Sequence, residues 1–134
     1  MTRFSITIQE SIDLVMYALT KGWGGEIVVP IAPSYRLLDV AKAVASDVEH
    51  RIVGVRQGEK IDEIMTTKSE SPQIARRDGY YIVCPTEGSW CRDDYCAKTN
   101  ALAVEDGFEY NSGTNDMRLS VEQIEKLIES EQII

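Results

Sequence analysis

One short stretch of the chain combines an arginine, a glycine and a carboxylate at a spacing that suits anion recognition. Arg56 follows a short apolar run, and Gly58 and Glu59 come two and three residues later. The guanidinium offers five N–H donors in a rigid fork that can grip a phosphate through two parallel hydrogen bonds. Gly58 suits a bend that needs positive φ, and Glu59 could accept from a pair of ligand hydroxyls. The alternative is a solvated turn with Arg56 in a surface ion pair.

The residues around this turn resemble a known family signature. Segment 56–63, Arg-Gln-Gly-Glu-Lys-Ile-Asp-Glu, is similar to the Arg-Pro-Gly-Glu-Lys-Leu-His-Glu motif of bacterial nucleotide-sugar 4,6-dehydratases. These are the inverting UDP-N-acetylglucosamine dehydratases of polysaccharide biosynthesis, within the extended short-chain dehydrogenase/reductase superfamily. Three further stretches agree in the same order, at residues 1–4, 25–30 and 108–120. The resemblance covers only the C-terminal part of such an enzyme.

The resemblance implies a site for a UDP-sugar. The family's motif arginine contacts the nucleotide diphosphate and corresponds to Arg56, and its glutamate contacts the ribose and corresponds to Glu59. Arg3, in the Thr-Arg-Phe stretch, is expected to supply a second basic contact near the sugar-phosphate. Gln57 replaces the family's proline, which loosens the turn. Asp62 replaces its histidine, and we expect that side chain to point away from the ligand.

We expect no catalytic residue and no cofactor site in this chain. A nicotinamide site needs a strand, a Gly-rich turn and a helix, whereas segment 22–25 follows a predicted helix and lacks the third glycine. Tyr17 and Lys21 match the superfamily's catalytic Tyr-x-x-x-Lys spacing, but collinearity places them well beyond the family's catalytic tyrosine, so we interpret the match as chance. By the resemblance, the NAD of the intact enzyme would be bound by an absent half, and this chain alone would be inactive.

Two classes of function fit this pattern. The first is the UDP-sugar-binding C-terminal domain of an NAD-dependent 4,6-dehydratase, a lyase of surface polysaccharide or glycan biosynthesis, present as a fragment or as a subunit of a split enzyme. The corresponding part of a UDP-sugar epimerase is an alternative within this class. The second is a stand-alone interaction or regulatory module that keeps the fold and not the nucleotide binding. The expected protein partner is a Rossmann-domain polypeptide or further copies of the chain.

Composition limits the remaining classes. A chain of 134 residues predicts a single domain. A net charge of −8 argues against nonspecific binding to nucleic acid or to an anionic membrane. No apolar run approaches the roughly 20 residues of a membrane helix, and the N-terminus shows no secretion signal, so a cytoplasmic location is expected.

The cysteines and the single histidine offer little chemistry. Cys84, Cys91 and Cys96 are odd in number and do not form a disulfide framework. A zinc site that adds His50 fits no common ligand spacing, so we expect reduced, partly buried cysteines and no metal. His50 is the single histidine of the sequence, so we find no suitable His base for a Ser or Cys nucleophile and expect no hydrolase triad.

The elements that must position these residues follow from apolar periodicity and caps. The pattern predicts a small mixed α/β domain of helix–strand–helix–strand order with a C-terminal helix, lacking the Rossmann nucleotide-binding half. The expected helices cover 8–21, opened by a Thr7–Glu10 capping box, a segment capped by Ser34, and a segment opened by a Ser120–Gln123 capping box. The expected strands cover 26–29, 51–55 and 80–84, with loops at 66–78 and 86–106.

The first predicted helix carries its apolar residues at helical spacing on one face. We expect this face to pack into the core. Its members are Ile8, Ile12, Val15, Met16 and Leu19.

Overall fold

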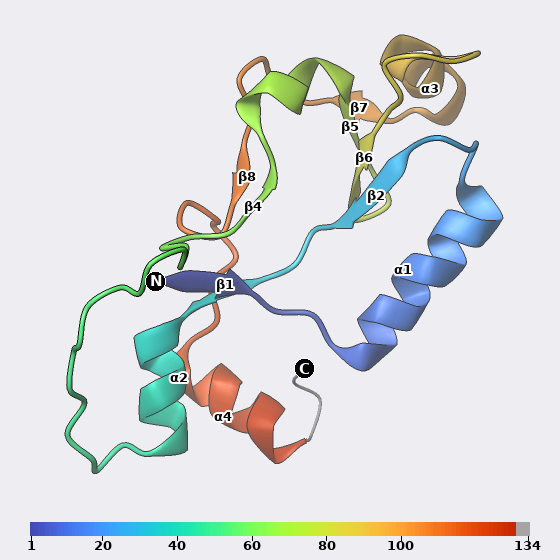
Figure 1. The fold of residues 1–134 in the computed structure, drawn as a ribbon. Helices are drawn as coiled ribbons and strands as arrows, with labels where there is room; N and C mark the ends of the chain where they lie inside the picture. Colours follow the sequence, from blue (N-terminus) through green and yellow to red (C-terminus); the bar gives the residue numbers. More distant parts are fainter. Residues whose placement is uncertain (131–134) are drawn as a thin grey trace. The chain divides into compact units, whose positions relative to one another are not determined.

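A computed structural model describes residues 1–130 of the chain (Figure 1). The helices are α1 (Ile8–Lys21), α2 (Leu37–Val44), the 3₁₀ helix η1 (Lys68–Gln73), α3 (Arg92–Thr99) and α4 (Val121–Glu129). The strands are β1 (Thr2–Phe4), β2 (Ile27–Pro30), β3 (Ser34–Arg36), β4 (Ile64–Thr66), β5 (Ile74–Arg77), β6 (Tyr80–Val83), β7 (Leu102–Ala103) and β8 (Tyr110–Asn111). The predicted mixed α/β class is confirmed.

The described chain groups into two compact units where we expected a single domain. Within the described residues, the first unit combines Met1–Ile8, Ala32–Ile64 and residues 111–130. The second combines Gln9–Ile31 and Met65–Tyr110. Segments far apart in sequence therefore build the first unit, which contains Arg3, Arg56 and Glu59.

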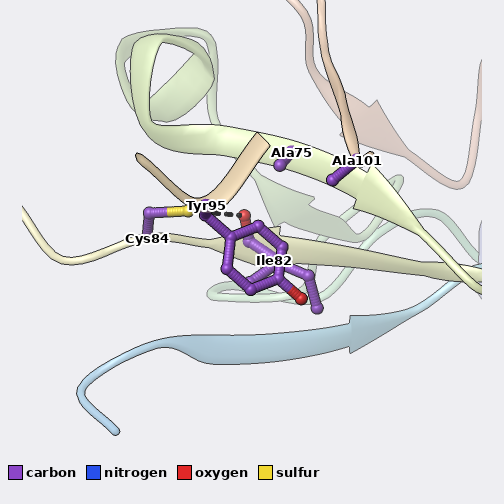
Figure 2. Close-up of a cluster of buried hydrophobic side chains, with 5 residues drawn as sticks. All are labelled: Ala75, Ile82, Cys84, Tyr95 and Ala101. Atoms are coloured by element: carbon purple, nitrogen blue, oxygen red, sulfur yellow. Dashed lines mark hydrogen bonds between the residues drawn. The ribbon is translucent and has the colours of Figure 1, made fainter. Parts of the chain in front are cut away.

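The second unit is organised around an antiparallel sheet of order β2-β6-β5-β7. Successive strand residues point to opposite faces, and β6 is buried on both because Tyr81 and Ile82 are each covered. Tyr81 packs against the ring of Phe108 at a centroid distance of 4.9 Å. On the other face, Figure 2 shows the Tyr95 side chain from α3 grouped with Ile82 and its neighbours. This cluster comprises Ala75, Ile82, Cys84, Tyr95 and Ala101.

Helix α1 forms where the periodicity predicts it, but the predicted core face is wrong. The whole apolar face is exposed, and Leu19 is 75% exposed. The half-buried side chains lie on a different stripe, at Ser11, Leu14 and Tyr17. Tyr17 packs on Tyr80 with ring centroids 4.3 Å apart. The apolar period therefore identified the helix and misidentified the side that is covered within the described chain.

The first unit pairs β1 with β3 and packs α2 against α4. The prediction that Ser34 caps a helix is wrong. Ser34 is a fully buried residue of β3. Its N–H donates to the Met117 carbonyl and its carbonyl accepts from Leu119 N–H, both at 2.8 Å. These partners lie more than 80 residues away, so local sequence gives no sign of them. Helix α2 begins three residues after Ser34, at Leu37.

The Ser120 capping box of α4 is confirmed. Gln123 N–H donates to Ser120 Oγ at 3.3 Å, and Ser120 N–H donates to Gln123 Oε1 at 2.8 Å. The exchange satisfies two N–H groups that a helix start leaves without partners. It fixes the first turn of α4, from which Ile124 is buried in the first unit.

Three sequence predictions fail between α2 and β8. The predicted strand 51–55 is absent, because Ile52 and Val53 are 89% and 80% exposed and no neighbouring strand pairs with them among residues 1–130 (Figure 1). The predicted loop 66–78 contains η1 and β5. The predicted loop 86–106 contains α3 and β7, and α3 lacked an apolar period because it buries only Tyr95.

Candidate functional site

Arg56 and Glu59 form the two ends of one tight turn. Glu59 N–H donates to the Arg56 carbonyl, and Arg56 N–H donates to Glu59 Oε2, each at 3.1 Å. Gly58 has φ +82°, so the backbone takes the left-handed conformation for which glycine is favoured. The second bond fixes one carboxylate oxygen of Glu59 against the backbone and leaves Oε1 for other donors. The predicted bend at Gly58 is confirmed.

The guanidinium of Arg56 is exposed and unpaired within the part of the chain that the structure describes. It forms no hydrogen bond or ion pair with any residue of 1–130, so the surface ion pair considered as an alternative is not found there. A guanidinium without protein acceptors keeps all five donors for another molecule or for water. The turn therefore carries an unpaired guanidinium at one end and a partly fixed carboxylate three residues later at the other end.

The side chain of Arg3 contacts residues 60–63, which directly follow this turn in sequence. Its N–H donors are directed at protein oxygens. Its Nη2 donates to the Lys60 carbonyl at 3.0 Å, and its Nη1 donates to the Ile61 carbonyl at 3.3 Å. Its Nε lies 3.6 Å from Glu63 Oε1. The structure thus places Arg3 against the residues that follow the turn, where it anchors the segment 60–63. A direct contact of Arg3 with a ligand stays a prediction.

Two buried hydroxyl groups form a polar cluster with residues 62 and 63. Thr2 Oγ1 donates to Asp62 Oδ1 at 2.6 Å and lies 2.6 Å from Ser112 Oγ. Ser112 Oγ accepts from Glu63 N–H at 2.9 Å, and Ser112 N–H donates to the Glu63 carbonyl at 2.9 Å. We call Thr2, Asp62, Glu63 and Ser112 the hydroxyl–carboxylate cluster. Asp62 was expected only to point away from a ligand; here it accepts from Thr2.

Sequence reasoning missed Thr2 and Ser112 as members of the site. Both residues lie inside stretches that carried the family resemblance, but their side chains have no chemistry that distinguishes them from solvated hydroxyls. Their burial and their partners 60 and 110 residues away appear only in the fold. The available signal was that Thr2 and Ser112 both lie inside the stretches that agree with the family, at residues 1–4 and 108–120.

The remaining motif residues hold the chain after Ser112. Asn115 Nδ2 donates to the Ala32 carbonyl at 2.9 Å, and Arg118 Nη2 donates to the Gly113 carbonyl at 2.9 Å. Gly113 N–H donates to Asn111 Oδ1 at 2.8 Å. These bonds satisfy backbone groups in a segment without regular structure, as buried or half-buried polar groups require. The Asn-Ser-Gly-Thr-Asn stretch is thus a scaffold for the first unit.

Tyr17 has the environment of a structural residue in the second unit. Its hydroxyl donates to Asp78 Oδ2 at 3.4 Å. Burial, followed by the hydrogen bond with Tyr95, raises the pKa of the Tyr17 phenol above its ordinary value. A tyrosine that must act as a catalytic acid or base near neutral pH needs its pKa lowered. The geometry therefore supports our interpretation of the Tyr17–Lys21 spacing as chance.

The three cysteines are free thiols. Cys84 is buried in the core cluster, where its Sγ donates to the Ile82 carbonyl (3.7 Å; dashed line in Figure 2) and burial raises its pKa to about 12. Cys91 is exposed and its Sγ donates to Asp94 Oδ2 at 3.1 Å. Among residues 1–130, no three potential ligands of the His, Cys, Asp or Glu types form a metal-binding group. In the same range, no helix is both long and apolar enough to cross a membrane.

The fold matches part of one solved protein structure. The X-ray structure of Pen from Bacillus thuringiensis superposes on 98% of this chain and 39% of its own, with a TM-score of 0.78 and 24% identity. At that identity the likeness establishes the fold alone. This class of mixed α/β fold makes up about two fifths of that longer protein.

The sequence comparisons then identify the family. The family model for "Polysaccharide biosynthesis protein" matches residues 1–85, which include Arg3, Arg56 and Glu59, and the chain belongs to this family. The UDP-N-acetylglucosamine 4,6-dehydratase (inverting) of Campylobacter jejuni subsp. jejuni serotype O:2 is 33% identical over 133 residues, covering 96% of this chain and 40% of the relative. The UDP-glucose 4-epimerase of Rickettsia felis is 34% identical over 138 residues, covering 96% and 38%.

The relatives confirm the resemblance read from the 56–63 signature. The chain spans about two fifths of the length of these proteins. Both a dehydratase and an epimerase are similar to it, so the family is one that includes nucleotide-sugar dehydratases and epimerases.

Proposed function

We propose that this chain is the UDP-sugar-binding region of a nucleotide-sugar dehydratase, with Arg56 and Glu59 as its nucleotide contacts. The observation that carries the proposal is the turn itself. Glu59 N–H donates to the Arg56 carbonyl and Arg56 N–H donates to the Glu59 carboxylate, which orients that carboxylate, while the Arg56 guanidinium stays unpaired within residues 1–130. The Arg56 fork matches the oxygens of a diphosphate, and Glu59 Oε1 suits a ribose hydroxyl. Two similar proteins are named for UDP-sugars, which supports this choice of ligand.

Within this proposal, the chain binds and orients the nucleotide and does not itself react with the sugar. Where NAD takes part, it supplies hydride transfer, and we propose that it binds to a Rossmann-domain polypeptide or segment that cooperates with this chain. The signature at 56–63 favours a dehydratase, and the 34% identity to an epimerase makes epimerisation the alternative reaction. A cytoplasmic location stays a prediction from the sequence.

Titration calorimetry with three ligands tests the proposed contacts. We expect heat of binding with UDP and with UDP-N-acetylglucosamine, and much weaker binding of uridine, because uridine lacks the phosphates that Arg56 would grip. Inorganic pyrophosphate serves as the control for a purely electrostatic effect. Equal affinity for UDP and uridine, or no heat at millimolar UDP, would overturn the proposal.

The alternative is an interaction module that does not bind nucleotide, and the exposed face of α1 favours it. A contiguous exposed apolar face commonly marks a contact with another protein. The module reading predicts no UDP binding together with concentration-dependent association in sedimentation velocity. UDP binding that depends on Arg56 would exclude it.

A further inference from the structure

We infer that Thr2, Ser112 and Asp62 are positioning residues for the turn at residues 56–59, which we call the nucleotide turn. This inference rests on the proposed function. None of the three is placed among the ligand contacts. They act through residues 60–63, which directly follow Glu59. The argument depends on how the turn is held, on the direction of the hydrogen bonds in the hydroxyl–carboxylate cluster, and on which bonds persist when one hydroxyl is removed.

The nucleotide turn is held from one side only. Residues 45–55 form no helix or strand, and Ile52 and Val53 extend into solvent. Among residues 1–130, the side-chain hydrogen bond of this segment is a local one, from Ser46 to Asp47. The other side of the turn is fixed at residues 60–63 by bonds to β1 and to Ser112. The orientation of Arg56 and Glu59 therefore depends on how firmly residues 60–63 are fixed.

The donor and acceptor capacity of each group fixes the direction of the hydrogen bonds in the hydroxyl–carboxylate cluster. The Asp62 carboxylate only accepts when ionised, so the Thr2 hydroxyl donates to it. Because Thr2 has no second proton on Oγ1, Ser112 must donate across the 2.6 Å contact between the two hydroxyls. Ser112 Oγ can then accept from Glu63 N–H. A single directed chain thus links the backbone of residue 63 to the carboxylate of residue 62 through two buried side chains.

Loss of one hydroxyl breaks this series of hydrogen bonds but leaves the backbone hydrogen bonds of the segment in place. Thr2 N–H still donates to the Ile61 carbonyl at 2.9 Å, and Ser112 N–H still donates to the Glu63 carbonyl. Arg3 also keeps its bonds to the carbonyls of residues 60 and 61. The fold is therefore retained while Glu63 N–H or the Asp62 carboxylate loses its fixed partner. The turn three residues away becomes less well ordered.

The test compares Thr2→Val and Ser112→Ala with two matched variants. Thr2→Val keeps the branched side chain and removes the hydroxyl, whereas Thr2→Ser keeps the hydroxyl and should rescue. Ser34→Ala is the control, because Ser34 is as fully buried as Ser112 and, within residues 1–130, its Oγ bonds only to the Met117 carbonyl at 3.5 Å. UDP affinity is measured by calorimetry, and hydrogen exchange is followed for the amides of residues 56–63.

We expect Thr2→Val and Ser112→Ala to weaken UDP binding about tenfold, the equivalent of one hydrogen bond, and to speed exchange of these amides. Thr2→Ser and Ser34→Ala should match the wild type in both. Unchanged affinity and exchange in the first two variants, or equal losses in Ser34→Ala, would overturn the inference. If the wild type does not bind UDP, the proposed function fails, and the exchange measurement still decides whether the cluster orders the turn.

Discussion

The Asp62 carboxylate lies so close to Gly113 that a Cβ atom added at residue 113 would be 2.7 Å from Asp62 Oδ2. No real Cβ contact is that short, so a side chain at 113 must displace the carboxylate. The same carboxylate accepts from Thr2 at 2.6 Å, which limits where it can move. Gly113 is therefore required by its neighbour and not by its own backbone conformation. This links the Ser-Gly pair of the late motif to the acidic end of the 56–63 signature.

The first prediction concerns this contact. We expect Gly113→Ala to lower the free energy of unfolding by about 1–3 kcal/mol, the usual cost of overpacking. In an Asp62→Ala background the added methyl has room, so the same substitution should cost much less. A double-mutant cycle by urea denaturation measures the difference. Additive effects of the two substitutions would show that the Asp62–Gly113 contact is not the cause.

The second prediction concerns the packing of α4. Ile124 is 1% exposed and Ile128, one helical turn later, is 39% exposed. We expect Ile124→Ala to cost about 2–5 kcal/mol of unfolding free energy, because it removes buried methyl groups and leaves a cavity. Ile128→Ala, with the same chemistry on the same helix, should cost clearly less. Similar losses for the two variants in denaturant titrations would mean that Ile124 is not the buried anchor.

The third prediction concerns pH and Cys84. Burial raises the pKa of this thiol in the folded state from 9.0 to about 12. A raised pKa means that folding favours the neutral thiol, so its contribution is complete below pH 9 and declines as the pH rises toward 12. The stability advantage of the wild type over Cys84→Ala should therefore narrow between pH 8 and pH 11. Cys91→Ala, at an exposed thiol, is the control; a constant advantage at Cys84 would contradict the prediction.

Local signals were sufficient for the helices that have a period and a cap. The apolar spacing of residues 8–21 and the Ser120–Gln123 box both predicted real helices, because each pattern is complete within a few residues. Helix α3 has no such pattern, since Tyr95 is its one buried residue. The apolar run at Ile52 and Val53 resembled a strand, but a strand forms only where another strand pairs with it.

The candidate site divides in the same way. Arg56, Gly58 and Glu59 are close in sequence, and the bend with positive φ at Gly58 was predictable from residue type. The residues behind them were not, because Thr2, Asp62 and Ser112 meet only after β1 and the chain beyond β8 are in place. Ser34 was misread as a helix cap for the same reason: its partners, at Met117 and Leu119, are distant in sequence.

The role of Arg56 in binding nucleotide is tested most directly by calorimetry of UDP with the wild type, Arg56→Ala and Lys60→Ala. Lys60 is exposed near the same turn and carries the same charge, so its substitution matches the change in net charge. We expect Arg56→Ala to weaken UDP binding by about ten- to a hundredfold, because a bidentate charged contact is lost. Lys60→Ala should bind nearly as the wild type does. Unaltered binding by Arg56→Ala, or an equal loss in Lys60→Ala, would contradict the account.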